Sequence, residues 1–230
     1  MPQNLTSSSL KRISNTFLFL FVQAYFFFYA AGHVALPRAW LYFGLVFFVV
    51  GINVTLLAIF KPKLLNQRGA TKNAEKSWDR WFFRLIPPCV IALSIISGLD
   101  IGRYHWSEIP APFTLIGVIF IVLSAVLMNW AMLKNPHFEV IIRIQHERDH
   151  QVIQEGPYRY LRHPGYTSAI LLYSSCPFII GSVWAFIPVT MLILLYCFRT
   201  SLEDRLLQQE LPGYSDYVEK VRYRLFPGLW

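Results

Sequence analysis

The fold of this chain is decided by residues 163–198, HPGYTSAILLYSSCPFIIGSVWAFIPVTMLILLYCF, a run of 36 residues without Asp, Glu, Lys or Arg. As one straight helix the run would be about 54 Å long, at a rise of about 1.5 Å per residue. The hydrocarbon core of a bilayer is only about 30 Å thick. Cys176-Pro177 and Gly181-Ser182 lie near the middle of the run, where a helix is most easily interrupted. The run therefore predicts a helical hairpin whose two arms begin and end on the same side of a membrane.

Four further uncharged runs precede the hairpin, at residues 13–37, 39–60, 85–99 and 109–133. A spanning helix needs about 20 apolar residues, so three of these runs are long enough to cross a bilayer. The third is marginal, and Pro87-Pro88 near its start predicts a short or tilted helix. The first run exceeds the apolar core of a signal peptide, which favours a retained anchor. We expect an all-α integral membrane protein, a multi-span helical bundle with a C-terminal helical hairpin.

The charges indicate how the bundle is oriented. The net charge is +8, and seven basic residues lie between the second and third runs, against Glu75 and Asp79: Lys61, Lys63, Arg68, Lys72, Lys76, Arg80 and Arg84. The positive-inside rule places this loop and the N-terminus in the cytosol. Four crossings then return residues 134–162 to the cytosol as well. A topology signal with attraction to anionic lipid explains the basic loop better than nucleic-acid binding, so we expect membrane lipids and no nucleic acid as partners.

Several common site types have no support in the sequence. The twelve glycines never occur as Gly-x-Gly, so a dinucleotide-binding loop of the Rossmann type is unsupported. The chain also lacks a serine nucleophile elbow. Cys89, Cys176 and Cys197 all lie in apolar runs and are interpreted as small buried side chains. Ser7-Ser8-Ser9 predicts a disordered tail. We divide the chain into a four-span membrane region, residues 1–133, and a C-terminal catalytic region, residues 134–230.

Residues 146–150, His-Glu-Arg-Asp-His, match the His-Glu-x-x-His pattern of zinc proteases. In those enzymes the two histidines share one face of a well-packed helix. Here the middle positions are charged and the flanking sequence is polar without apolar helical periodicity. We interpret the segment as a solvated charged loop and expect no metal.

The stretch from His150 to Tyr166 places arginine, histidine and tyrosine at the mouth of the hydrophobic hairpin. Arg199 directly follows the second arm and is one helical turn from Glu203. An exposed pair at that spacing contributes about 0.3–0.5 kcal/mol. An arginine at the depth of lipid is costly, however, and usually functional. Taken individually, Arg159 and Arg162 are typical of residues that anchor a protein to lipid headgroups. His163-Pro164 is typical of the start of a helix. Together these residues indicate a site where a charged cytosolic ligand meets a lipophilic one.

The C-terminal region resembles the isoprenylcysteine carboxyl methyltransferase family, within the wider group of membrane methyltransferases that includes the phospholipid methyltransferases. The resemblance covers roughly residues 140–230. It rests on His150-Gln-Val-Ile, Gly156-Pro-Tyr158, Arg162-His-Pro-Gly-Tyr166, Arg199, Glu203-Asp204, Leu207, Tyr214-x-x-Tyr217, Val221 and Leu225-Phe-Pro227. Asp204 stands where a second Glu is usual, Pro212-Gly213 shortens the segment before Tyr214, and the spacing from Gln145 to His150 is tighter than in the eukaryotic enzymes.

The resemblance implies S-adenosyl-L-methionine as the cofactor. The positions that resemble its binding elements are Gln145, His150, Gln151, Val152, Ile153, Tyr158, His163, Pro164, Gly165, Tyr166 and Glu203. Arg199 falls where such enzymes place an arginine beside the methyl acceptor, and Arg162 is the second candidate catalytic residue. These segments are expected on the cytosolic side of the membrane.

The sequence thus predicts an integral membrane methyltransferase that transfers a methyl group from S-adenosylmethionine to a lipophilic or small acceptor. We expect the acceptor group to be a carboxylate or a thiol, for example of a prenylcysteine-like molecule. The sequence does not identify the acceptor, and a prenylated-cysteine carboxylate, a small thiol, a phospholipid amine and an isoprenoid acid all stay open. One alternative is a membrane NADPH-dependent sterol-type reductase, which would require a basic cluster beyond Arg159 and Arg162 for the 2′-phosphate. Another is a non-enzymatic transporter, which would place charged residues inside the spans.

Overall fold

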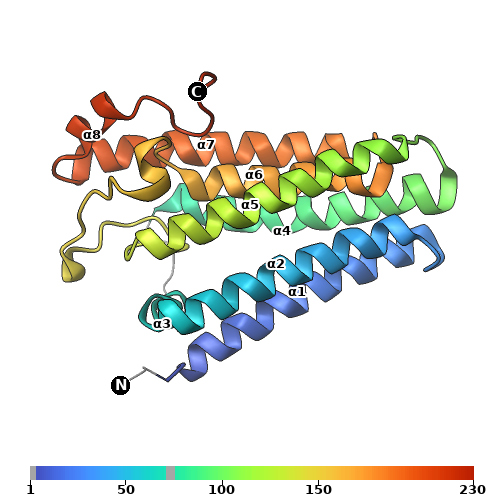
Figure 1. Cartoon of the computed structure of the whole chain (residues 1–230), viewed down its shortest axis with the longest axis horizontal. Coiled ribbons are helices and arrows are strands. Elements are labelled where there is room, and N and C mark those ends of the chain that lie inside the picture. The colour runs from blue at the N-terminus through green and yellow to red at the C-terminus, as the bar shows by residue number, and fades with distance from the viewer. Residues whose placement is uncertain (1–3, 71–75) are drawn as a thin grey trace.

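The computed structural model describes residues 4–70 and 76–230, so Lys72 and Glu75 of the basic loop lie outside the described residues. Figure 1 shows a helical bundle with α3 (Pro62–Gly69) and α8 (Tyr214–Lys220) at one end of it. The bundle helices are α1 (Ser7–Ala31), α2 (Pro37–Phe60), α4 (Ser77–Gly98), α5 (Thr114–Lys134), α6 (Pro164–Cys176) and α7 (Phe186–Glu210).

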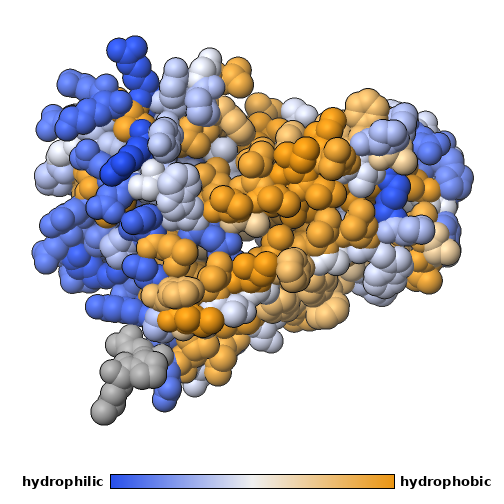
Figure 2. All heavy atoms as spheres, in the orientation of Figure 1, coloured by the Kyte–Doolittle hydropathy of each residue, from blue (hydrophilic) through white to orange (hydrophobic). Residues whose placement is uncertain are grey.

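Among the described residues, five helices are long and apolar enough to cross a membrane: Ser7–Ala31, Pro37–Phe60, Ser77–Tyr104, Ala111–Lys134 and Phe186–Glu210. On the face shown in Figure 2, an apolar zone crosses the middle of the bundle between two more hydrophilic ends. Large apolar side chains such as Phe48, Val126 and Leu194 are exposed. An exposed apolar surface of this extent is typical of contact with lipid. The predicted all-α, multi-span membrane fold is confirmed.

The hairpin predicted from residues 163–198 is present. Helix α6 ends at Cys176, a π-helical turn follows over Pro177–Gly181, and α7 begins at Phe186. Gly181 has a φ of 98°, which favours glycine. The side chain of Arg38 satisfies carbonyl groups freed by the break, since it donates to Phe178 and Ile179 at 2.7 Å each and to Ile109 at 2.8 Å. The break therefore lies where proline and glycine indicated it.

Of the two expectations for the third span, a short helix is wrong, and a tilted one stays a prediction. Helix α4 runs through Pro87 and Pro88, and a π-helical turn extends it from Leu99 to Tyr104. The helix begins before the uncharged run because its first turns also pack inside the protein, where Asp79 and Phe82 are buried. Proline within a spanning helix is tolerated when neighbouring groups compensate for the lost hydrogen bonds.

The expectation of a disordered serine tail is also wrong. Ser7-Ser8-Ser9 form the first turn of α1, and the hydroxyl of Thr6 caps that turn by accepting from the Ser9 amide at 3.3 Å. The Ser9 hydroxyl donates to Asn66 of α3 at 2.7 Å. These long-range contacts order a segment whose composition alone favours disorder.

Helices α5 and α6 approach each other closely through small residues. The Ser124 hydroxyl donates to the Ser168 carbonyl at 2.8 Å, and the Ser168 hydroxyl donates to the Ser124 carbonyl at 2.9 Å. Nearer the break, a Cβ on Gly117 would lie 2.5 Å from Ile179. Small residues and reciprocal hydroxyl contacts are typical of helix packing in membranes. This packing fixes the start of α6 beside the end of α5, and residues 135–163 connect them across the end of the bundle.

Candidate active site

One cavity of about 240 Å³ lies at the end of the bundle that carries α3 and α8. Its walls come from the end of α5, residues 135–163, the start of α6, the end of α7, and α8. All thirteen predicted site residues line it: Gln145, His150, Gln151, Val152, Ile153, Tyr158, Arg162, His163, Pro164, Gly165, Tyr166, Arg199 and Glu203. Segments distant in the sequence therefore converge on one space.

Residues 135–163, which we call the covering loop, lie over this cavity. Its Gln145 is almost fully buried and donates to the His137 carbonyl at 2.8 Å. Arg143 forms ion pairs with Glu139 at 2.9 Å and with Glu147 at 2.7 Å. The loop is therefore held by buried polar contacts in place of regular secondary structure.

The His-Glu-x-x-His segment does not adopt the geometry of a zinc-binding helix. His146–Arg148 form a single 3-10 turn, and Asp149 has a φ of 47°. His146 and His150 therefore do not share a helix face. His146 is exposed, whereas His150 is half-buried, with its ring centroid 4.5 Å from that of His137.

His150 lies in an environment that favours its neutral form. Burial, followed by the positive charge of His137 and of Arg148, lowers the pKa of His150 to about 4. The Nδ1 atom lies 3.4 Å from the Gln145 amide, which makes it the acceptor for that N–H. A neutral imidazole beside the cavity can donate through its other nitrogen to an anionic or heteroaromatic ligand.

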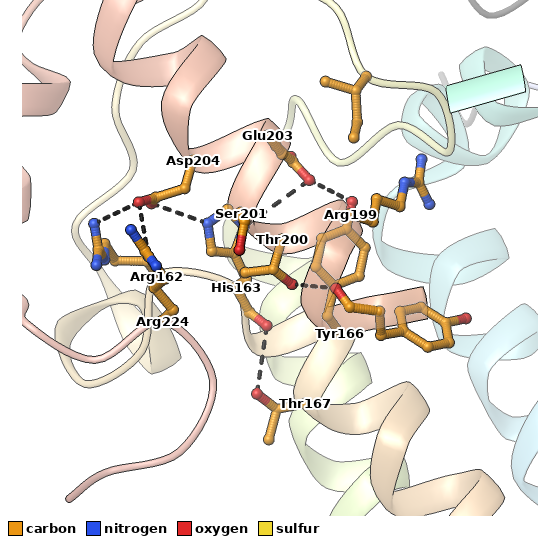
Figure 3. Close-up of polar contacts among 12 residues, drawn as sticks. Arg162, His163, Tyr166, Thr167, Arg199, Thr200, Ser201, Glu203, Asp204 and Arg224 are labelled. Atoms are coloured by element: carbon orange, nitrogen blue, oxygen red, sulfur yellow. Dashed lines mark hydrogen bonds and ion pairs between the residues drawn. The ribbon is translucent and has the colours of Figure 1, made fainter. Parts of the chain in front are cut away.

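Asp204 is the centre of a buried network that joins α7 to α6 and to the C-terminal tail (Figure 3). Its carboxylate is fully buried. It accepts from Arg162 at 2.9 Å, from His163 at 3.2 Å, and from Tyr214 and Arg224 at 3.0 Å each. The backbone supports the same junction, because the His163 amide donates to the Arg224 carbonyl at 3.0 Å.

Glu203, the next residue, faces the cavity and not the tail. Its side chain is 21% exposed and accepts a short hydrogen bond from the Tyr166 hydroxyl. The Nδ1 atom of His163 lies 4.0 Å from the same carboxylate, and the rings of His163 and Tyr166 stack with centroids 5.7 Å apart. The His163 imidazole thus lies between the carboxylates of Glu203 and Asp204, which fixes its orientation.

Arg199 is 5% exposed, and three aromatic rings surround its guanidinium. The ring centroids of Phe82, Phe83 and Tyr166 lie 4.2, 4.9 and 5.3 Å from its central carbon. Its Nη2 atom lies 2.8 Å from Asp79 and donates to the Val140 carbonyl at 2.7 Å. Its buried Nε has no hydrogen-bond partner in the described part of the chain.

Arg162 lies in a different environment from Arg199, although both line the cavity. Its Nη1 atom is committed to Asp204, and its Nη2 atom donates to the Arg222 carbonyl at 3.2 Å. Through these contacts Arg162 links α7 to the C-terminal tail. A catalytic role for Arg162 stays a prediction.

Sequence reasoning missed the contribution of α4 to the site. Asp79, Phe82 and Phe83 contact Arg199 from a helix that lies more than a hundred residues earlier in the chain. Asp79 was noted only as one of two acidic residues in a basic loop. The available signal was the spacing i, i+3, i+4, which places these three side chains on one helix face.

The cavity is amphipathic. Its apolar lining includes Met128, Phe138, Ala169, Leu207 and Leu211. Its ionisable lining includes Glu203, His163 and Arg199. A space with this division suits two reactants, one charged and one lipophilic, held side by side.

Comparisons with known proteins agree with the resemblance seen in the sequence. Residues 113–212 match the phospholipid methyltransferase family. The chain is 25% identical over 109 residues to a probable protein-S-isoprenylcysteine O-methyltransferase of Oryza sativa subsp. indica, and equally to one of subsp. japonica. Each alignment covers 46% of this chain and 57% of the relative, so the chain spans little more than half the length of these curated relatives.

A solved structure extends the likeness to the fold. The eukaryotic intramembrane Ras methyltransferase, an isoprenylcysteine carboxyl methyltransferase, superposes with a TM-score of 0.54 at 20% identity. The superposition covers 91% of this chain and 74% of that one. The comparisons confirm the resemblance to the isoprenylcysteine carboxyl methyltransferase family and the predicted fold.

Proposed function

We propose that this protein is an integral membrane methyltransferase that uses S-adenosyl-L-methionine. Its acceptor is a lipophilic or small molecule with a carboxylate or a thiol. The observation that carries the proposal is the single cavity lined by all thirteen predicted site residues, at the polar end of a membrane bundle. A non-enzymatic transporter would have no need for such a convergence of ionisable groups at one closed end.

The donor set of the cavity fits the cofactor. S-adenosylmethionine carries an ammonium and a carboxylate at its methionine end, and its sulfonium is cationic. Glu203 offers a carboxylate for the ammonium or a ribose hydroxyl, and residues 150–153 offer an imidazole and backbone amides for the carboxylate or the adenine. Tyr158 and Tyr166 supply aromatic side chains suited to the adenine or the sulfonium.

The residues of the chain contribute position and shielding to the reaction. When bound, the cofactor supplies an electrophilic methyl group for an in-line displacement. The covering loop and the apolar lining exclude water and hold the reactants together, and such orientation accounts for much of the rate of bimolecular steps in enzymes. Arg199 donates to the acceptor carboxylate or stabilises a thiolate, which places the nucleophilic atom.

The charge of the cavity favours an anionic acceptor. Arg199 is a buried cation at the apolar side of the site, and a cation there repels a protonated amine. An S-prenylcysteine carboxylate, as in the names of the matched relatives, is therefore a better first candidate for the acceptor than a phospholipid amine. The NADPH reductase alternative is disfavoured, because Arg143 and Arg162 are each already paired with a carboxylate.

Label transfer tests this proposal directly. Purified protein in detergent is mixed with S-adenosylmethionine labelled at the methyl group and with an S-prenylcysteine that has a free carboxylate. We expect base-labile label on this probe, as for a methyl ester, and none on the same probe with its carboxylate amidated. Glu203→Ala should abolish transfer, and the exposed Glu219→Ala should not. Protein that binds no cofactor and labels neither the probe, a lipophilic thiol nor phosphatidylethanolamine vesicles contradicts the proposal.

A further inference from the structure

The orientation of Arg199 depends on a residue that no comparison assigns to the site. Asp79 lies in the first turn of α4 and is fully buried. One carboxylate oxygen, Oδ1, lies 2.8 Å from Arg199 Nη2. The other, Oδ2, accepts from the Ile142 amide at 3.0 Å, so the same carboxylate also contacts the covering loop.

Stability alone is a weak reason for a carboxylate at this position. Desolvation of a buried ion pair commonly offsets its attraction, and apolar replacements of such pairs are often as stable. Phe82 and Phe83, on the same face of α4, already enclose the guanidinium with their rings. The ion pair with Asp79 also orients the guanidinium, because it fixes which edge of the planar group points to α4.

We propose that Asp79 is a positioning residue for the methyl acceptor and acts through Arg199. The inference rests on the proposed function. Asp79 and the Val140 carbonyl hold Nη2, which orients the guanidinium and leaves its other N–H groups for the acceptor anion. Without Asp79 the guanidinium would rotate among its aromatic neighbours, and the acceptor would lose its alignment with the methyl group.

The position of Asp79 makes the N-terminal half part of the site. The phospholipid methyltransferase match begins at residue 113, so α4 lies outside it. A helix that varies independently of the cofactor-binding segments would set acceptor geometry without altering cofactor binding. The Asp79–Arg199 pair is the point where α4 meets those segments.

Asp79→Asn tests the proposal, since it keeps the shape and an oxygen for the Ile142 amide but removes the charge. In the label-transfer assay we expect kcat to fall at least about tenfold, with S-adenosylmethionine affinity within about twofold of wild type. The matched control is Asp100→Asn, which alters an equally buried carboxylate at the opposite end of the same span, bonded to Ser107 and Ser182. That variant should lose thermal stability and retain transfer.

A double-mutant cycle separates positioning from a structural role. Arg199→Lys alone should also lower kcat at least about tenfold, because lysine lacks the planar donor geometry. If Asp79 acts through Arg199, adding Asp79→Asn to Arg199→Lys should cause little further loss. Losses that multiply, or wild-type turnover in Asp79→Asn, overturn the inference while the proposed function stands. A wild-type protein without any transfer overturns both. Should Asp79→Asn not fold, Asp79→Ser replaces it, because it also removes the charge and keeps an oxygen for the Ile142 amide, with the same criteria.

Discussion

At the scale of single residues, the site places two adjacent carboxylates in different environments. Asp204 is fully buried and accepts from several side chains, whereas Glu203 is partly open to the cavity and accepts from Tyr166. Consecutive residues on a helix point about 100° apart, which follows from about 3.6 residues per turn. One carboxylate therefore serves the structure, and the other remains available to a ligand.

Replacement of the buried carboxylate should be costly. Asp204→Asn leaves Arg162 and His163 without their charged partner in a buried setting. Loss of one member of a buried ion pair typically costs about 3–5 kcal/mol. We expect a clear fall in the thermal unfolding temperature in detergent, with weakened cofactor binding. The exposed Asp216→Asn on α8 is the control and should unfold at the wild-type temperature. Equal unfolding temperatures for the two variants would rule out the structural role of Asp204.

At the scale of elements, the covering loop depends on the protonation state of its histidines. His150 contacts His137 and lies near Arg148 and Arg143, so a positive charge on its ring is unfavourable. The pKa of His137 is also lowered, mainly by burial. Because two of its histidines have a lowered pKa, we expect this loop to be the part of the site most sensitive to acid.

Acidification should therefore loosen the loop before the bundle. The pKa of His150 is about 4 in the folded protein, against 6.5 for an unperturbed histidine. Between these values the unfolded state binds the proton and the folded state does not, so stability falls as pH falls from about 6.5 towards about 4 and is level above. Hydrogen exchange of residues 135–163 should rise as pH is lowered from about 7 to about 5, after correction for intrinsic rates. His150→Asn should reduce this rise. An identical pH dependence in that variant would exclude His150 as its source.

The elements show which kind of signal the sequence carries. The hairpin was predictable because its causes are local: an uncharged run, then proline and glycine at the break. The start of α4 was not, because Asp79 and Phe82 are buried through contacts with distant helices. The segments predicted to bind the cofactor were identifiable from the order of their motif residues. Asp79 lacked such a motif, and an acid within a basic loop is typical of a solvated surface.

At the scale of the whole molecule, the two ends of the bundle differ. Figure 1 places α3, α8 and the covering loop at one end, and Figure 2 shows that this end is the more hydrophilic. The segments before and after the hairpin meet there, as in the Tyr217 hydroxyl that donates to the Tyr158 carbonyl at 2.7 Å. Both segments lie at the same end of the bundle, which supports the prediction that they share one side of a membrane. That this side is cytosolic, and that the chain divides at residue 133, stay predictions.

Cysteine labelling tests the orientation. In a background without the three native cysteines, single cysteines at positions 155 and 216 should react with an impermeant maleimide from the cytosolic side of sealed vesicles. Both positions are exposed at the cavity end of the bundle. A cysteine at position 108, exposed at the opposite end, should react only from the other side. Labelling of 155 and 216 from the non-cytosolic side would reverse the assigned orientation.

Binding of S-adenosylmethionine to the purified, detergent-solubilised protein is the most direct test of the central claim, that this cavity is a cofactor site. Isothermal titration should give one site per chain. His163→Ala and Glu203→Ala should each weaken S-adenosylmethionine binding by about 1.5–3 kcal/mol, the usual cost of losing a hydrogen bond to a charged group. The exposed Glu219→Ala should bind as wild type does. No binding to the wild-type protein, or wild-type affinity in both cavity variants when they are folded, would contradict the account.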